Sequence, residues 1–292
     1  MLIRRSSPGD ITFDILNFLF LTIFSLLCVY PFLYVFNLSI SEGISGSEYG
    51  FHLLPKGITF KYYAMTIGSS AVYWGFYNSV YRTVIGTILG TALTAMPAYA
   101  ISKKNFPNRN FWSTFILIPM FFGGGLIPTY FLIKSLNLID NRWVLILPCL
   151  MGTYNIILIR TFIQNIPGSL EESAKIDGAN EVVIFYKILM PICKPILATV
   201  ALWTAVGHWN SWFDSLLYIT SEKKVVLQVV LQQIVAMGTI RLATNNVSQS
   251  QLPPPFTIIA CTIMITTIPI ILVYPFLQKY FIKGIMIGSL KG

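Results

Sequence analysis

Residues 166–191 read IPGSLEESAKIDGANEVVIFYKILMP and form a polar stretch between two long apolar runs. A Pro-Gly pair at its start breaks the preceding helix. Ser169 is followed three residues later by Glu172, which matches a capping box and predicts that a new helix starts there. Gly178 accepts a positive φ and is expected to end or sharply bend that helix. The stretch therefore predicts two short helices that meet at an angle.

The second short helix is expected to have an apolar face. That face is formed by Val182, Val183, Phe185, Tyr186 and Leu189. Pro191 is expected to close the helix. From the residues alone, two interpretations stay open. The helix pair is either an interfacial element that lies on lipid headgroups or a docking element for a partner protein.

Long apolar runs on both sides of this stretch predict a membrane protein. A transmembrane helix needs about 20 mostly apolar residues. Six runs approach that length: Leu16–Phe36, Asn78–Ile101, Phe111–Ile133, Trp143–Ile159, Pro195–Leu217 and Phe256–Leu277. They predict an all-α, polytopic membrane protein with six transmembrane helices in a single domain over residues 1–292.

The composition agrees with this class. The chain is 55% hydrophobic and 11% charged, whereas a soluble domain carries about 25% charged residues. This deficit excludes an ordinary soluble enzyme. The net charge of +9 is attributed to basic loop residues that orient a membrane protein, and not to nucleic-acid binding. The first run exceeds the apolar core of a signal peptide, which is about 7–15 residues, so a cleaved signal is disfavoured.

The positions of Lys and Arg set the expected orientation. With the N-terminus inside, inner segments hold 12 of the 20 basic residues and outer segments hold 8, where Arg82 is counted at the start of a helix. The short segment 102–110 is basic and contains no acid. Both termini and the loop 164–191 are therefore expected on the cytoplasmic side, and the loops 39–77 and 218–255 outside.

The quoted stretch also resembles a signature of permease subunits of ATP-binding-cassette (ABC) importers. That signature is Glu-Ala-Ala, three residues, Gly, nine residues and Ile-x-Leu-Pro. Here it reads Glu172-Ser173-Ala174, Gly178 and Ile188-Leu189-Met190-Pro191 with the same spacing. Ser173 and Met190 depart from it by small changes in size. The fuller form Asp177-Gly178-Ala179 with Phe185 resembles the carbohydrate branch, to which the maltose importer permeases also belong.

Two further stretches resemble one subfamily of this branch. Residues 120–130 read MFFGGGLIPTY, and residues 207–214 read GHWNSWFD. Both are similar to the oligosaccharide and polysaccharide importers related to the LplC and YtcP permeases. The resemblance extends over most of the chain.

The resemblance implies a type I ABC importer permease in the bacterial plasma membrane. In this family the loop sits in a groove of the cytoplasmic ATPase and transmits its closure to the transmembrane helices. The coupling residues implied here are Glu171, Glu172, Ser173, Ala174, Asp177, Gly178, Ala179, Phe185 and Pro191. The implied partners are a second homologous permease, forming a heterodimer, two ABC ATPase subunits and an extracellular sugar-binding protein.

No cofactor is expected on this chain itself. Its sequence contains no G-x-x-x-x-G-K-[ST] phosphate loop, so ATP and Mg are expected on the partner ATPase. No catalytic triad, zinc motif or carboxylate pair is evident. Cys28, Cys149, Cys193 and Cys261 form no C-x-x-C pair, and with two histidines they predict neither disulfides nor a metal site.

An aromatic and polar cluster lies near the outer half of the fifth run. It consists of Trp203, His208, Trp209, Asn210, Trp212 and Asp214. One interpretation is an interfacial aromatic belt. The other is a sugar path, in which rings contact sugar C–H groups while Asn and Asp bind hydroxyls. Both interpretations stay open.

Two other functional classes compete with an ABC importer. An ion-coupled secondary transporter would need buried acids that relay protons, and Asp214 is the single acid within a run. An intramembrane enzyme would need catalytic side chains that the sequence does not offer. The triplet Gly123-Gly124-Gly125 either permits close helix packing or breaks the third run to line a cavity.

Overall fold

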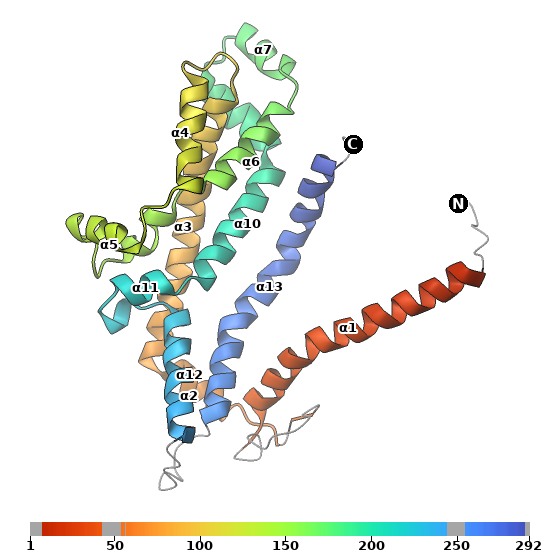
Figure 1. The fold of residues 1–292 in the computed structure, drawn as a ribbon, viewed down its shortest axis with the longest axis vertical. Coiled ribbons are helices and arrows are strands. Elements are labelled where there is room, and N and C mark those ends of the chain that lie inside the picture. The colour runs from red at the N-terminus through yellow and green to blue at the C-terminus, as the bar shows by residue number, and fades with distance from the viewer. Residues whose placement is uncertain (1–7, 43–53, 56, 244–254, 290–292) are drawn as a thin grey trace. The chain divides into compact units, whose positions relative to one another are not determined.

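The computed structural model describes residues 8–42, 54–55, 57–243 and 255–289. Within these residues the regular structure is helical, apart from an isolated antiparallel bridge between Ser41 and Ile58 (Figure 1). The predicted all-α class is confirmed. The chain divides into two compact units, Met1–Ser69 with Gln233–Ile265 and Ser70–Gln232 with Thr266–Gly292.

The first unit contains α1 (Pro8–Ile40) and α2 (Lys61–Gly68). The apolar run Leu16–Phe36 lies inside α1, and no residue of the most apolar window of this helix is buried. Contacts gather instead at the end of this helix. The Ser39 hydroxyl lies 2.8 Å from that of Tyr63, and the Cys261 thiol donates to the Ser39 carbonyl over 3.3 Å.

In the second unit, α3 (Ser70–Ser102) packs against α6 (Thr153–Gln164) and α10 (Lys194–Asn210). Figure 1 shows these three helices side by side. α3 begins at Ser70, well before the predicted start at Asn78. The shared core is made of small and branched residues, including Ala98, Ile159 and Val200, each with essentially no exposed surface.

Three of the six predicted runs are not straight helices. The third run consists of α4 (Arg109–Phe121) and α5 (Leu126–Ser135), bent by 113°. The break falls at the glycine triplet, where Gly125 has a φ of +79°. The fourth run consists of two 3-10 turns, η2 (Arg142–Leu145) and η3 (Leu147–Cys149), followed by α6. The fifth run ends as a helix at Asn210 and resumes as α11 (Phe213–Tyr218).

Among the described residues, three helices are long and apolar enough to cross a membrane, judged by length and composition, and up to six spans result when each of three bent pairs counts as one. The last is α13 (Pro255–Ser289), which holds the sixth run. The loop predicted at 218–255 contains η5 (Glu222–Lys224) and the 17-residue helix α12 (Leu227–Ala243). Residues 43–53, 56 and 244–254 of the two predicted external loops lie outside the described residues, as do Arg4, Arg5 and Lys291 of the charge count.

Candidate functional site

The first short helix of the quoted stretch is α7 (Ser169–Ile176). The predicted capping box is wrong, because no side chain caps this helix. Gly168 already has helical dihedrals, φ −63° and ψ −23°, so Ser169 is the first helical residue and not the cap. The backbone carbonyl of Gly168 accepts hydrogen bonds from the amides of Glu171 and Glu172 over 3.0 and 3.1 Å. These two acids still lie in the first turn, where the helix dipole favours negative charge.

The predicted positive φ of Gly178, which ends the first short helix, is confirmed at +83°. The Gly178 amide donates to the Lys175 carbonyl over 3.1 Å, and the Ala179 amide donates to the Ala174 carbonyl over 2.9 Å. This pair of bonds is a Schellman motif, which ends a helix with a left-handed residue. Ala174 is buried in the core and Ala179 packs beside it. The turn between the two helices is therefore fixed both by backbone bonds and by apolar contact.

The second short helix runs through α8 (Glu181–Val183), the π-helical η4 (Ile184–Leu189) and α9 (Met190–Ile192). Its start is capped by Asn180, whose side chain accepts from the Val183 amide over 2.9 Å. The sequence reasoning missed this cap, although Asn before an apolar segment is an ordinary capping signal. Pro191 does not close the helix as predicted. The chain turns by 79° only after Ile192.

The predicted apolar face of this second helix is partly corrected. Ile184, Phe185 and Leu189 are buried, whereas Val182 and Tyr186 are more than half exposed. The buried side packs on the core shared by α3, α6 and α10. The nine predicted coupling residues accordingly differ in how far they are exposed. Ala174 and Phe185 are buried and Glu171 and Ala179 are half-buried, while Glu172, Ser173, Asp177, Gly178 and Pro191 are exposed.

Ionic contacts join the two short helices to the end of α3. Lys103 pairs with Glu171 of α7, and its ammonium lies 4.3 Å from the ring centre of Tyr99. The Tyr99 hydroxyl donates to Glu181 of α8 over 2.5 Å. Glu181 also pairs with Lys175 at 2.7 Å, and this hydrogen bond raises the pKa of Lys175 above its ordinary value. We call this set of five residues the Lys103 network.

A second polar cluster is buried where α3 meets the break after α10. Arg82 is 1% exposed and pairs with both carboxylate oxygens of Asp214, with Nη1 to Oδ1 at 3.0 Å. The same Nη1 donates to the Ser211 carbonyl over 3.2 Å, and Nε donates to Nδ1 of His208 over 3.3 Å. Arg82 therefore fixes the non-helical link between α10 and α11.

This Arg82 cluster was missed at the sequence level. The apolar run that begins at Asn78 predicts that Arg82 lies at the start of a helix, yet Arg82 lies well inside α3. An ionisable side chain inside an apolar run is itself a signal, because such groups are costly in a membrane and require a partner. Asp214, the single acid within the six predicted runs, is that partner.

Close packing between α3 and α10 depends on Gly86. A Cβ built on Gly86 would lie 2.4 Å from Nε2 of His208, which is closer than non-bonded heavy atoms pack in proteins. His208 is 4% exposed, so its ring has little room to move. The glycine therefore lets the imidazole lie directly on the backbone of α3.

The residues of the predicted sugar path also differ in exposure. His208 and Trp209 are buried, and Asp214 is held by Arg82, whereas Trp203, Asn210 and Trp212 are exposed. The Trp209 indole donates to the Thr266 carbonyl over 3.0 Å. Trp203 stacks on Tyr154, with ring centres 6.0 Å apart. Trp203, Asn210 and Trp212 present most of the accessible side-chain surface, the Asp214 side chain is 19% exposed, and the sugar path stays a prediction.

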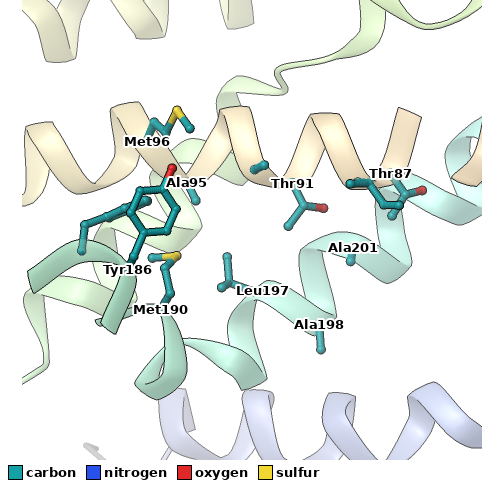
Figure 2. A pocket seen from close by; sticks show the side chains of 12 residues that line it. Thr87, Thr91, Ala95, Met96, Tyr186, Met190, Leu197, Ala198 and Ala201 are labelled. Carbon is teal, nitrogen blue, oxygen red and sulfur yellow. The ribbon is translucent and has the colours of Figure 1, made fainter. Parts of the chain in front are cut away.

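An apolar cavity of about 430 Å³ lies beside the second short helix. Figure 2 shows Tyr186 and Met190 on one side and Ala95, Met96 and Thr91 of α3 on the other. Leu197, Ala198 and Ala201 of α10 complete the wall. On this side, therefore, α3 and the helix pair are not fully packed.

Another ionic contact lies in the segments that follow α5 and α11. Asp140 accepts hydrogen bonds from the backbone and hydroxyl of Ser221 and from the ammonium of Lys224 at 2.7 Å. Burial alone would raise the pKa of the Asp140 carboxyl, but these hydrogen bonds outweigh burial and hold that pKa well below its usual range. Among the described residues, no group of three or more His, Cys, Asp and Glu side chains is arranged to hold a metal ion.

Residues 83–287 match the model of a protein family described as "Binding-protein-dependent transport system inner membrane component". The chain belongs to this family. The permease is 39% identical to protein LplC of Bacillus subtilis strain 168 over 280 residues, which cover 96% of this chain and 95% of LplC. It is 40% identical to the polygalacturonan/rhamnogalacturonan transport system permease protein YtcP of the same organism over 281 residues, covering 96% and 98%.

A solved structure has the same fold as the permease. It is a bacterial ABC transporter involved in the import of the acidic polysaccharide alginate, with a TM-score of 0.86 and 32% identity over 95% of this chain and 99% of that one. The resemblance to ABC importer permeases is thus confirmed. The permease is an integral protein of the cell membrane and acts with an ATPase and a substrate-binding protein.

Proposed function

We propose that this permease forms half of the translocation path of an ATP-driven importer for an oligosaccharide or polysaccharide. The observation that carries the proposal is the helix pair formed by residues 169–192. Its inward side is anchored in the core through Ala174 and Phe185, while Glu172, Asp177 and Ile176 face away from it. Ile176 is 86% exposed, which suits a side chain that enters a partner's groove.

The proposed substrate class follows from the named relatives. YtcP is a polygalacturonan/rhamnogalacturonan transport permease, and the structural neighbour takes part in alginate import. Both names refer to acidic polysaccharides. An ion-coupled secondary transporter is not favoured, because Asp214 is neutralised by Arg82 and so is unsuited to carry protons.

The proposed assembly contains a second, homologous permease as a heterodimer, two ABC ATPase subunits and an extracellular sugar-binding protein. ATP and Mg bind the ATPase, and this chain neither binds a cofactor nor hydrolyses ATP. The chain crosses the plasma membrane six times as one domain over residues 1–292, with both termini in the cytoplasm.

The assembly test is co-purification. Expressed alone, the permease should show no ATP hydrolysis. Expressed with its sister permease and a cognate ATPase, it should be recovered as one complex with MgATP hydrolysis that rises when a loaded binding protein is added. Recovery of transport in vesicles that contain no ATPase would contradict the proposal.

The topology test is cysteine labelling in a background that lacks Cys28 and Cys149, the two exposed native cysteines. Single cysteines at Asn105 or Lys175 should react only with a reagent that crosses the membrane. Single cysteines at Ser47 or Ser248, which lie outside the described residues, should react in intact cells. The reverse pattern would place the helix pair outside and remove its docking role.

A further inference from the structure

The Lys103 network joins three helices in a closed ring of contacts. Lys103, directly after α3, pairs with Glu171 of α7. On α7, Lys175 pairs with Glu181 of α8, and Glu181 accepts from Tyr99 of α3. Lys103 lies over the Tyr99 ring and so closes the ring. Each short helix therefore has its own polar link to the end of α3 as well as a link to the other.

The links differ in how far water screens them. The side chains of Lys103 and Glu171 are 21% and 20% exposed, whereas those of Lys175 and Glu181 are 52% and 56% exposed. A shielded ion pair interacts more strongly than an exposed one, because the surrounding dielectric constant is lower. The Lys103–Glu171 pair is therefore the stronger ionic link, and it joins α7 directly to α3.

Apolar packing anchors the second short helix in the shared core, but it does not extend along the whole contact with α3. Phe185 packs on Tyr99 with ring centres 5.0 Å apart, but the cavity of Figure 2 separates Tyr186 and Met190 from the neighbouring turns of α3. The second short helix therefore has an unfilled apolar side next to α3. The polar links of the Lys103 network add to the apolar contact and help to set the angle between this helix and α3.

We propose that the Lys103 network is a brace that makes the helix pair and α3 move as one body. Lys103 and Tyr99 are positioning residues in this proposal, since they hold the loop and do not themselves contact the ATPase. The proposal rests on the proposed function, because it assumes that an ATPase moves the loop. With the brace intact, movement of α7 is passed to α3 and is not absorbed by bending at Gly178.

The test follows α3 directly and needs no sugar. Ile88 of α3 is 62% exposed and borders the cavity, so a single cysteine at Ile88 reports on the surroundings of α3. It is placed in the complex of both permeases and the ATPase, with Cys28 and Cys149 replaced. Maleimide reactivity is measured without nucleotide and after trapping with MgATP and vanadate. The reactivity should differ between the two states.

Charge exchange then tests the brace. Lys103→Glu and Glu171→Lys should each reduce the nucleotide-dependent difference at Ile88 about three- to tenfold, because a like-charge pair replaces an attraction. The double variant, with Lys103→Glu and Glu171→Lys together, should restore it. Lys104→Glu is the matched control, since Lys104 is exposed and has no ion pair among the residues described. Bound ATPase and basal MgATP hydrolysis are measured in every variant.

Three results would overturn the brace. In the first, Lys103→Glu shows the same nucleotide-dependent difference in reactivity as Lys104→Glu. In the second, the double variant shows a difference as small as that of the worse single variant. In the third, the reactivity of the cysteine that replaces Ile88 is the same with and without nucleotide in the otherwise wild-type complex. None of these three results contradicts the proposed function as long as the ATPase co-purifies with the permease. Failure of the wild-type chain to hold any ATPase would instead overturn the proposed function itself.

Discussion

The helix pair contacts the C-terminal end of α3, whereas the Arg82 cluster lies within the N-terminal half of that helix, and the two are stabilised in different ways. The helix pair is held by a backbone motif within six residues, by the Lys103–Glu171 pair, which is about a fifth exposed, and by the Lys175–Glu181 pair, which is about half exposed. The Arg82 cluster joins residues 132 positions apart through an arginine that is 1% exposed. Exposed ion pairs contribute about 0–1 kcal/mol, whereas breaking a buried pair costs about 3–5 kcal/mol. The comparison predicts that changes in the cluster impair folding and changes in the helix pair impair coupling.

The largest expected effect is that of Asp214→Ala. This change leaves the Arg82 guanidinium buried without its partner, which destabilises the fold by about 3–5 kcal/mol. The measurement is thermal unfolding and yield in detergent. Asp14→Ala removes an acid from the exposed surface of α1 and serves as the control. If both variants unfold at the same temperature, the cluster does not stabilise the fold.

A double change sharpens this result. Replacing Arg82 and Asp214 together by Leu removes both charges, so no uncompensated charge remains buried. The double variant should therefore unfold at a higher temperature than Asp214→Ala. A double variant that is less stable than Asp214→Ala would show that the hydrogen bonds to Ser211 and His208 matter more than charge balance.

The next effect in size is that of Gly86→Ala. The added Cβ would lie 2.4 Å from Nε2 of His208, so α10 or the imidazole must shift. Overpacking of a tight contact costs about 1–3 kcal/mol. Gly207→Ala, one residue before His208, is the matched control because a Cβ there meets nothing within 4 Å. Equal unfolding temperatures for the two variants would show that the contact is not tight.

Gly178→Val tests the other half of the comparison. The residue needs φ +83°, and a side chain there meets nothing within 4 Å, so the cost is purely that of the backbone conformation. That cost is about 1–2 kcal/mol and falls on the turn between the short helices. The fold should insert normally, while the amount of ATPase that co-purifies should fall.

Gly168→Ala is the control for this turn, because Gly168 has a negative φ and equally open space. Gly178→Asn should retain more ATPase than Gly178→Val, since Asn tolerates the left-handed region. If Gly178→Val binds the ATPase and couples as the wild type does, the pair is a lipid-surface element and the docking interpretation is wrong.

Features of one short segment were predictable from the sequence, and features that depend on distant residues were not. Gly178 was predicted because a left-handed turn needs glycine whatever packs around it. The capping box failed because Gly168 took up a helical conformation, which sequence does not dictate. Arg82 was missed because its partner lies 132 residues away and hydropathy placed the helix boundary too late.

The predicted membrane runs show the same limit. Hydropathy located all six apolar segments but not the bends within them. The 113° bend falls at Gly123–Gly125, where the sequence had left packing and breakage open. Hydropathy predicts a loop where the helix α12 lies, because the apolar part of α12 is too short for a transmembrane helix.

The smallest expected effect is that of Asp140→Asn, at a partly exposed ion pair. The pKa of Asp140 is lower in the folded chain than in the unfolded chain, where a carboxyl titrates near about 3.9. The native state therefore binds fewer protons there, and the stabilisation is complete above that value and is lost as pH falls through the folded pKa. The pair with Lys224 is about a third exposed, so it contributes about 1 kcal/mol or less to stability.

Asp140→Asn should lower the unfolding temperature slightly at pH 7, and the difference in unfolding temperature from wild type should narrow below pH of about 4. A difference that stays constant from pH 7 to pH of about 3 would show that the carboxylate charge contributes nothing and that the amide keeps the same hydrogen bonds.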